Sequence, residues 1–392
     1  MTSATQERLL TAADILENAK SLAPAIRARS DEIERGRRLP PDVVELLREA
    51  GVFRMNMPRG WGGPEMTPMQ QNEVIEELSK ADASVGWCAM IGSDSGLYSA
   101  FLDQDVAREM FPRLDMIMAG LVYPAGRAER VPGGYRVSGR WTFGSGCTHC
   151  DWLAAGCLVY DNGRPFLAGG DLPEWRIVLA PPSSYTIHDT WVSTGLRGSG
   201  SHDYEARSLF VPAERTFTFR DESRRPGALY RQPDTFLRKM PGIPLGVARE
   251  AIDYVIAAAR KTFDMPAMVP YTEVPRIQAT VAAAEAMLGA ARAYVFESFA
   301  THWARLEAGG EPTVQERASI MLARMNAFQA SRDVVSLMYD AMGGAAVYAD
   351  KTPLDRHLRD LMTMCQHTMG QRKVGQWVGR LLLTGKSDAP FL

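Results

Sequence analysis

Apolar and polar positions follow a helical period over the first part of the chain. Apolar pairs recur three residues apart, as at Val43-Val44 and Leu46-Leu47. The WGGP sequence at 61–64 interrupts this period, and a more apolar helix is expected over about 84–102. We therefore expect an N-terminal α-helical domain over residues 1–118.

Short β-rich runs replace the helical pattern between residues 119 and 225. Examples lie at 121–123 and 175–179, and Gly, Pro, Asn and Asp separate such runs, as at 161–163. Short strands at regular spacing with turn residues between them are typical of a barrel or a sandwich. This region is expected to be a middle β-domain.

Helical periodicity returns in the last part of the chain, residues 226–392. Long segments with an apolar face predict four helices of about 20–30 residues each, and a set of this kind predicts an antiparallel four-helix bundle. The four segments are 243–263, 276–306, 314–342 and 354–383. The order of helices, a small β-domain and a bundle indicates an α+β fold class, and by itself it specifies no chemistry.

Composition narrows the functional classes. Of the 392 residues, 46% are hydrophobic and 23% charged, and the formal net charge is −2, which is typical of a globular protein. Lys and Arg are spread along the chain, so we expect no nucleic acid as a partner. We find no run of about 18 apolar residues and no apolar core of a signal peptide, so we expect no membrane association and a cytoplasmic location.

The cysteines suggest neither a disulfide framework nor a metal site. The chain has five cysteines, too few for a stapled scaffold of this length. Cys147-Thr148-His149-Cys150 is the one cluster with a metal-like spacing, and the other cysteines do not form a second pair. A closed zinc site needs four ligands, so we expect no metal.

Five short motifs occur in a fixed order along most of the chain. They are WGG at 61–63, GGYRVSGRW at 133–141, GLRGSGS leading to VP at 195–212, RKTF at 260–263, and GG at 343–344 followed by PL and RD at 353–360. In this order they resemble the signature segments of the acyl-CoA dehydrogenase family. The resemblance implies that family's fold, with an N-terminal helical domain, a middle β-domain and a C-terminal four-helix bundle, and it implies a flavin cofactor.

The sequence departs from the dehydrogenases where their chemistry takes place. Thr368 stands eight residues after Asp360, where the family's catalytic glutamate is found, and a hydroxyl cannot abstract an α-proton as a carboxylate can. The stretch 236–240, where some members carry an alternative glutamate, contains no acid. The segment YPAGR at 123–127 lacks the Ser-Asp of the family's flavin-contacting strand.

A branch of the family resembles the chain more closely. The reduced-flavin monooxygenases of two-component systems carry a pattern that WTFGSGCTHCDW at 141–152 fits, and they place a histidine where His367 stands, seven residues after Asp360. Phenol-hydroxylating members of this branch often carry a histidine in the apolar helix after the GW pair, whereas this chain has Ser95 near that position. His149 belongs to the matched pattern.

The resemblance implies roles for individual residues, and each has a simpler structural reading. His367 would be the catalytic acid/base, and otherwise a solvated helix histidine. Ser145 would be catalytic and bind near flavin N5, and otherwise be a serine in a tight turn. Arg260 would reach the flavin pyrophosphate from a neighbouring subunit, and otherwise be an exposed arginine at a helix end. Arg197 is read as structural.

Further residues complete the expected site. The expected cofactor-binding set is Trp141, Phe143, Ser145, Gly146, Arg260, Phe263, Gly343 and Gly344. The expected substrate pocket is Ser95, Tyr123 and Thr368. The methionines near the expected pocket are read as adaptable core filler.

Three functions remain open from the sequence. The favoured one is a flavin-dependent monooxygenase that uses reduced flavin and O₂ on a small, aromatic or polycyclic substrate. FAD is favoured over FMN, and a homotetramer is expected. The chain has no GxGxxG fingerprint after a strand, so a separate flavin reductase is the expected partner. The alternatives are a flavin dehydrogenase or oxidase acting on a thioester, and a non-catalytic scaffold.

Overall fold

The structure is a computed structural model that describes residues 9–167 and 173–387. Its first region is helical, as the period predicts. The helices are α1 (Ala12–Arg27), α2 (Ser30–Gly36), α3 (Pro41–Glu49), α4 (Pro68–Ala81), α5 (Ala83–Gly92), α6 (Ser95–Ser99) and α7 (Gln104–Met110). Capping boxes begin α1 at Thr11 and α4 at Thr67, where each threonine hydroxyl accepts a backbone N–H that has no partner within the helix.

The apolar helix expected over about 84–102 is two helices in the structure. It breaks at Ser93 and Asp94, between α5 and α6. The buried Asn56 side chain donates to the backbone carbonyl of Ser93 at 3.0 Å, so this carbonyl bonds outside the helix. The break turns Asp94 inward, where its side chain becomes part of the site described below.

The middle region forms one sheet, with the pairing order β6-β7-β2-β1-β3-β5-β8 and β4 beside β3. The strands are β1 (Met118–Val131), β2 (Gly134–Gly144), β3 (Trp152–Asp161), β4 (Arg164–Pro165), β5 (Trp175–Ala180), β6 (Thr186–His188), β7 (His202–Pro212) and β8 (Thr216–Phe217). The β1–β3 pair is parallel and its register shifts between Leu121 and Gly126, whereas the other described pairs are antiparallel. Asn162 and Gly163, both at positive φ, make the tight β3–β4 turn.

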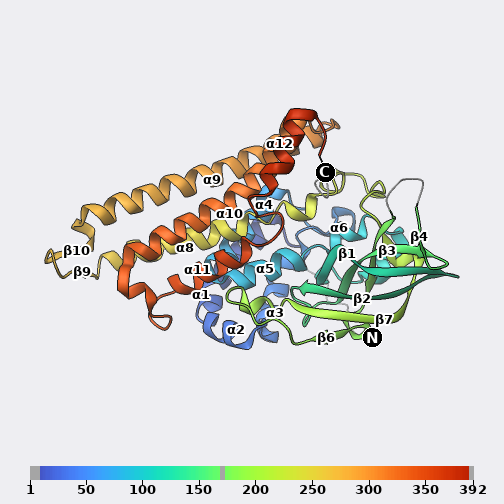
Figure 1. Ribbon diagram of the computed structural model, residues 1–392, viewed down its shortest axis with the longest axis horizontal. Helices are drawn as coiled ribbons and strands as arrows, with labels where there is room; N and C mark the ends of the chain where they lie inside the picture. The colour runs from blue at the N-terminus through green and yellow to red at the C-terminus, as the bar shows by residue number, and fades with distance from the viewer. Residues whose placement is uncertain (1–8, 168–172, 388–392) are drawn as a thin grey trace.

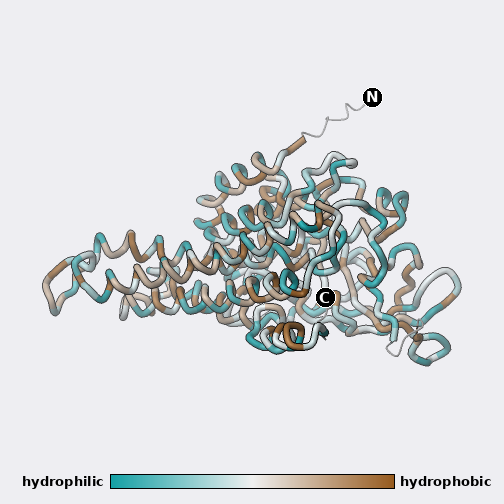
Figure 2. The backbone as a smooth tube through the Cα atoms, turned by 90° about the horizontal axis from the view of Figure 1, so that it is seen from above, coloured by the Kyte–Doolittle hydropathy of each residue, from teal (hydrophilic) through white to brown (hydrophobic). Residues whose placement is uncertain are grey.

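The last region is a helical bundle that projects away from the sheet (Figure 1). Its helices are α8 (Gly242–Ala259), α9 (Pro275–Glu307), α10 (Val314–Met342), α11 (Leu354–Met364) and α12 (Val374–Thr384). Strands β9 (Phe263–Asp264) and β10 (Val269–Pro270) form a short hairpin at the end of the bundle far from the sheet (Figure 1). Hydrophobic and hydrophilic residues alternate along these helices, as Figure 2 shows.

The single helix expected over 354–383 is wrong, because α11 and α12 are separate. The connection between them packs onto α10, where Gly370 lies so close that an added Cβ would come within 2.8 Å of the Phe328 ring. Gln329 on α10 also donates to the Gly370 carbonyl at 2.8 Å. His367 therefore lies in a non-helical connection, and the solvated helix reading of this residue is excluded.

Short 3₁₀ segments link the longer elements. They are η1 (Val52–Arg54), η2 (Arg59–Trp61), η3 (Pro182–Ser184), η4 (Arg197–Ser199), η5 (Ala213–Arg215), η6 (Ala228–Tyr230), η7 (Thr235–Leu237), η8 (Tyr271–Glu273) and η9 (Gly343–Val347). One large apolar core runs through the N-terminal helices, the sheet and the bundle. Among the described helices, none has the length and apolar character needed to cross a membrane.

Candidate active site

A cavity of about 630 Å³ lies where the N-terminal helices, the sheet and the bundle meet. This volume is within the usual range for a small-molecule site. Its walls are mostly apolar and aromatic, and they come from α5, β1, the loop before η4, η7 and the α11–α12 connection. The apolar lining includes Trp87, Met90, Leu121, Phe143, Trp191 and Leu237. Such walls suit a flat ring system.

A row of three serine hydroxyls leads from the cavity wall into the interior of the protein. The Trp87 indole N–H donates to Ser145 Oγ at 3.0 Å, and Ser145 Oγ lies 2.7 Å from Ser201 Oγ. Ser201 Oγ in turn lies 2.7 Å from Ser199 Oγ, and the Ser199 hydroxyl donates to the Leu196 carbonyl at 2.7 Å. We call Ser145, Ser201 and Ser199 the serine relay.

The direction of the serine relay follows from the count of hydrogens. Each hydroxyl has one hydrogen to donate. The Ser199 hydrogen goes to a carbonyl, so Ser201 donates to Ser199 and Ser145 donates to Ser201. Ser145 Oγ is then left with one free lone pair, since its other lone pair accepts from Trp87. Toward a bound molecule, Ser145 is therefore preorganised as an acceptor.

His367 lies in the cavity wall and is held as a neutral ring. Its Nδ1 accepts the Met369 backbone N–H at 3.3 Å, which leaves the ring proton on Nε2. Burial, together with the nearby charge of Arg324, lowers the pKa of His367 to about 4. The Trp87 ring meets the imidazole edge-on, with 5.7 Å between ring centroids. Near pH 7 this histidine is thus a hydrogen-bond donor through Nε2 and carries no charge.

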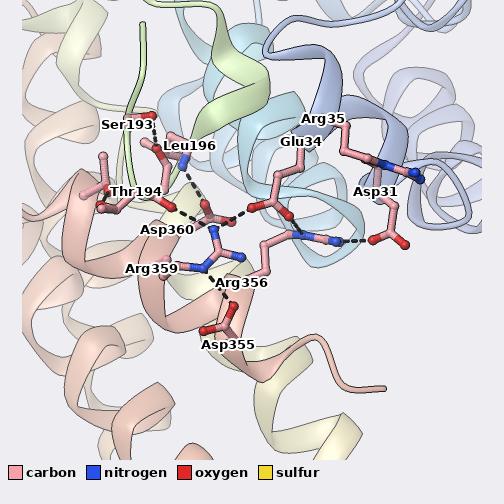
Figure 3. A network of polar contacts seen from close by, with 12 residues as sticks. Asp31, Glu34, Arg35, Ser193, Thr194, Leu196, Asp355, Arg356, Arg359 and Asp360 are labelled. Atoms are coloured by element: carbon pink, nitrogen blue, oxygen red, sulfur yellow. Dashed lines mark hydrogen bonds and ion pairs between the residues drawn. The ribbon is translucent and has the colours of Figure 1, made fainter. Parts of the chain in front are cut away.

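An ionic network joins α11, which precedes His367, to α2 and to the loop at 193–196 (Figure 3). Arg359 on α11 bonds Glu34 of α2 at 2.5 Å, Asp355 at 2.8 Å and the Thr194 carbonyl at 2.7 Å. The Leu196 backbone N–H donates to Asp360 Oδ1 at 2.6 Å. The network ties α11 to the loop at 193–196, which lines the cavity. Arg359 and Asp360, the RD pair, therefore hold the cavity-lining loop at 193–196 in place against α11.

Asp360 is held in its neutral form. Burial and the neighbouring carboxylate of Asp82 raise the pKa of Asp360 to about 8, and the Leu196 N–H opposes this rise. A protonated carboxyl costs less to bury than a charged one. The network therefore adds little uncompensated charge beside the cavity.

The structure brings four of the sequence-predicted site residues to the cavity. Phe143, Ser145, His367 and Thr368 all line it. Phe143 has a φ of 59°, and its ring lies edge-on to Trp191 at 6.1 Å between centroids. Gly146 is the next residue after Ser145, has a φ of 76°, and donates its N–H to the Ser199 carbonyl at 3.0 Å. Gly146 shapes the turn and does not line the cavity.

Three other predicted residues lie outside the cavity. Trp141 is fully buried in the sheet core, where its indole N–H donates to the Gly156 carbonyl at 2.8 Å. Ser95 is also fully buried, and its hydroxyl donates to the Met116 carbonyl. Tyr123 is 62% exposed, and its ring contacts Trp175 edge-on. None of the three lines the cavity within one chain: Trp141 and Ser95 are buried, and Tyr123 lies at the surface.

The remaining predicted residues lie at the end of the bundle far from the sheet, which we call the distal end (Figure 1). Arg260 is exposed at the C-terminus of α8, and Phe263 in β9 is 54% exposed. A Cβ added to Gly343 or Gly344 would meet no atom within 4 Å. Within one chain these residues do not reach the cavity.

The sequence analysis missed most of the residues that line the cavity, among them Trp87, Ser201 and one charged residue, Asp94. Asp94 lines the cavity, is 3% exposed, and forms an ion pair with the fully buried Lys239. The available signal was an aspartate within an otherwise apolar helical segment, because a buried charge of this kind needs a partner. No group of three or more His, Cys, Asp or Glu in the described ranges could hold a metal ion.

Comparison with known proteins identifies relatives over the whole length. Two family models match: "Acyl-CoA dehydrogenase, N-terminal domain" over residues 12–114, and "Acyl-CoA dehydrogenase, C-terminal domain" over residues 242–372. Indole-3-acetate monooxygenase of Pseudomonas putida is 31% identical, with 93% of this chain and 92% of the relative aligned. The oxygenase component of the FADH₂-dependent resorcinol hydroxylase from Rhizobium sp. is 29% identical, with 92% of each chain covered.

Solved structures agree with this relationship. The 3-HSA hydroxylase from Rhodococcus sp. RHA1 superposes with a TM-score of 0.87 at 25% identity, covering 96% of this chain and 98% of that one. The HsaA monooxygenase from M. tuberculosis gives a TM-score of 0.89 at 24% identity, with coverages of 98% and 100%, and supports the fold. The expected three-part architecture is thereby confirmed.

Proposed function

The chain belongs to the acyl-CoA dehydrogenase family, among its flavin-dependent monooxygenases, and we propose that it is the oxygenase component of a two-component system acting on a small aromatic substrate. It is a flavin-dependent oxidoreductase that takes its flavin in the reduced state. One observation carries the substrate and residue assignments. A largely apolar, aromatic cavity holds an acceptor-oriented Ser145 and a neutral donor, His367, and lacks a carboxylate at the dehydrogenase position.

The cavity fits a flavin by its shape and its polar groups. Its volume and its aromatic lining suit a flat heterocycle together with a small substrate. Ser145 Oγ offers a lone pair, and reduced flavin carries an N–H at N5 that oxidised flavin lacks. We assign Ser145 to this N–H, so the direction of the serine relay favours the reduced cofactor.

When bound, reduced flavin supplies the two electrons that activate O₂ for insertion into a substrate. The chain's contribution is to keep water out and to place donors. Trp87, Phe143 and Trp191 present ring surface to the cavity. Exclusion of water prevents premature loss of activated oxygen as H₂O₂. His367 donates a hydrogen bond from Nε2 in this dry setting, and it does so without introducing a positive charge.

The alternative function, a flavin dehydrogenase acting on a thioester, would need a catalytic base that the cavity does not provide. Thr368 lines the cavity at the position of the family glutamate, and Asp94, the one acidic residue among the lining residues described, is paired with Lys239. A paired carboxylate is a weak base for removing an α-proton from a thioester. We therefore expect no turnover of saturated acyl-CoA with a dye acceptor.

The distal end supports a proposal about assembly. Arg260, Phe263, Gly343 and Gly344 match family motifs for cofactor binding, yet they lie away from the cavity of their own chain. We propose that the chain forms a homotetramer in which the distal end of one subunit completes the cofactor site of another. Native mass measurement should give four chains, and a monomer with flavin fully bound would contradict this proposal.

Two partners follow from the proposed reaction. A separate flavin reductase supplies the reduced cofactor, and FAD is preferred to FMN because Arg260 suits the pyrophosphate that FMN lacks. The relatives named for indole-3-acetate and resorcinol indicate the size and type of substrate to try first.

Labelled oxygen tests the proposed function directly. The protein is mixed with chemically reduced FAD, ¹⁸O₂ and a panel that includes indole-3-acetate, indole and resorcinol. We expect one ¹⁸O atom in the product of at least one panel member. Flavin oxidation that yields H₂O₂ and no labelled product with every member would refute the proposal.

A further inference from the structure

Asp94 stands out among the residues that line the cavity. It is the one charged residue in the described lining, and the surrounding wall is apolar. Nothing in the family motifs accounts for it. Because burying a charged group is costly, a carboxylate retained in such a wall calls for a function or a compensating partner.

Lys239 compensates the charge from behind the wall. Its ammonium group contacts Asp94 Oδ1, and the lysine itself is fully buried and does not line the cavity. The Asn56 amide also donates to Oδ1, at 3.5 Å. Burial raises the pKa of the Asp94 carboxyl and the charge of Lys239 opposes that rise. The pair therefore has no net charge, with its negative end toward the cavity.

The second carboxylate oxygen has no donor in the described parts of the chain. Both recorded hydrogen bonds to the Asp94 side chain end on Oδ1, so none is made to Oδ2. A carboxylate accepts several hydrogen bonds, so Oδ2 is available to a donor in the cavity. A ligand that brings an N–H or O–H group to Oδ2 gains a hydrogen bond to a charged acceptor.

Asp94 lies apart from Ser145 and His367, the other polar groups of the cavity, and this separation determines how a ligand is oriented. Trp87, Met90 and Ile91 line the cavity from α5, and Asp94 lines it from the break that follows this helix. Trp87 stands seven positions before Asp94 in the sequence, with Met90 and Ile91 between them. Trp87 contacts both Ser145 and His367. The cavity therefore has a polar group at each end of an apolar wall.

We propose that Asp94, held by Lys239, is the specificity-determining residue that accepts a hydrogen bond from an N–H or O–H group on the aromatic substrate. The inference rests on the proposed function and names the substrate class more closely. Rings that carry such a donor are selected, and rings in which the donor is methylated or replaced by sulfur are rejected. A site built to bond a donor discriminates strongly against the analogue that lacks it.

Ligand affinity, measured apart from turnover, tests this proposal. The holoprotein with reduced FAD is titrated anaerobically with indole, 1-methylindole and benzothiophene. We expect indole to bind roughly 10- to 100-fold more tightly than the other two, as for a hydrogen bond to a charged acceptor. In the double variant Asp94→Leu/Lys239→Met, which leaves no buried charge unpaired, this preference should fall to within roughly 3-fold.

A second variant covers the case in which the double variant does not fold. In Asp94→Asn, Lys239 holds the amide oxygen and the amide NH₂ group faces the cavity, so the preference for indole should disappear or invert. Asp161→Asn, a change in an exposed carboxylate of β3, is the matched control and should keep the wild-type preference.

The outcomes separate this inference from the proposed function. Equal binding of indole and 1-methylindole by the wild type, or an unchanged preference in the Asp94 variants, overturns the inference even when labelled product forms. If no ligand binds and no panel member yields labelled product, the proposed function fails and the inference fails with it.

Discussion

The cavity and the distal end of the bundle differ in how far their polar and apolar groups are satisfied within one chain. At the cavity, Ser145 and His367 have defined hydrogen-bond partners, and Asp94 has its lysine. At the distal end, Val347 and Tyr348 are 60% and 52% exposed, and a Cβ added to Gly343 or Gly344 would meet no atom within 4 Å. The polar groups of the first end are satisfied within one chain, whereas the second end presents exposed apolar side chains.

The family motifs accordingly fall into two groups, those near the cavity and those at the distal end. Motifs near the cavity are satisfied by contacts within the chain, so their roles are visible in a single subunit. The motifs at 260–263 and 343–344 make mainly local contacts, such as the hydrogen bond from the Thr262 hydroxyl to the Ala258 carbonyl, and the proposed second copy would account for their exposed side chains.

The largest effect is expected at the cavity, from His367→Ala. Loss of the Nε2 donor should leave binding of reduced flavin intact and shift O₂ use toward H₂O₂, with product per O₂ lowered roughly 100-fold. The ratio of product to O₂ consumed measures this effect. His188→Ala, in β6, is the control and should keep the ratio. A variant that loses only thermal stability would show that His367 is structural.

The next effect concerns the distal end. Arg260→Ala should weaken FAD binding roughly 10-fold, because a guanidinium bond to the pyrophosphate is lost, and should weaken FMN binding less. Equilibrium titration with both flavins measures the difference. Lys261→Ala removes the adjacent exposed charge and should change both affinities equally. Equal losses for FAD and FMN in Arg260→Ala would count against a pyrophosphate contact.

A smaller effect is expected from the serine relay. Ser201→Ala removes the acceptor of the Ser145 hydrogen, so Ser145 can turn its hydroxyl toward the cofactor. The preference for reduced over oxidised flavin should fall by roughly 2- to 10-fold, the value of one neutral hydrogen bond. The flavin reduction potential on and off the protein reports this preference. Ser336→Ala on α10, whose hydroxyl bonds its own helix, should leave the potential unchanged.

The smallest effect is a pH dependence of stability that comes from His367. Its pKa in the folded chain is about 4, below the ordinary 6.5, so folding favours the neutral ring. This contribution is complete above pH 6.5 and is lost as the pH falls from 6.5 through 4, by at most about 1.4 kcal/mol per pH unit. As the pH falls from 6.5 to 4, the free energy of unfolding of the wild type should therefore fall relative to that of His367→Gln, as measured by denaturant titration of both. Parallel curves would contradict a neutral buried imidazole.

The sequence by itself determined the class of fold and the class of chemistry. Helical and strand periods predicted three regions, and ordered motifs identified the family, because local patterns record which faces must be buried. They also placed His367 and Ser145, since their spacing from RD at 359–360 and within 141–152 is local. The sequence alone also showed that Thr368 stands where the dehydrogenases carry their catalytic glutamate.

The tertiary structure decided which of these residues share a site. It removed Trp141, Ser95 and Tyr123 from the cavity, because burial and exposure depend on how the sheet packs against its neighbours. It also brought Asp94 to Lys239 across 145 positions of sequence, and no local pattern records such a pairing. The protonation of His367 was likewise decided by packing, because desolvation acts only once the surrounding elements have assembled.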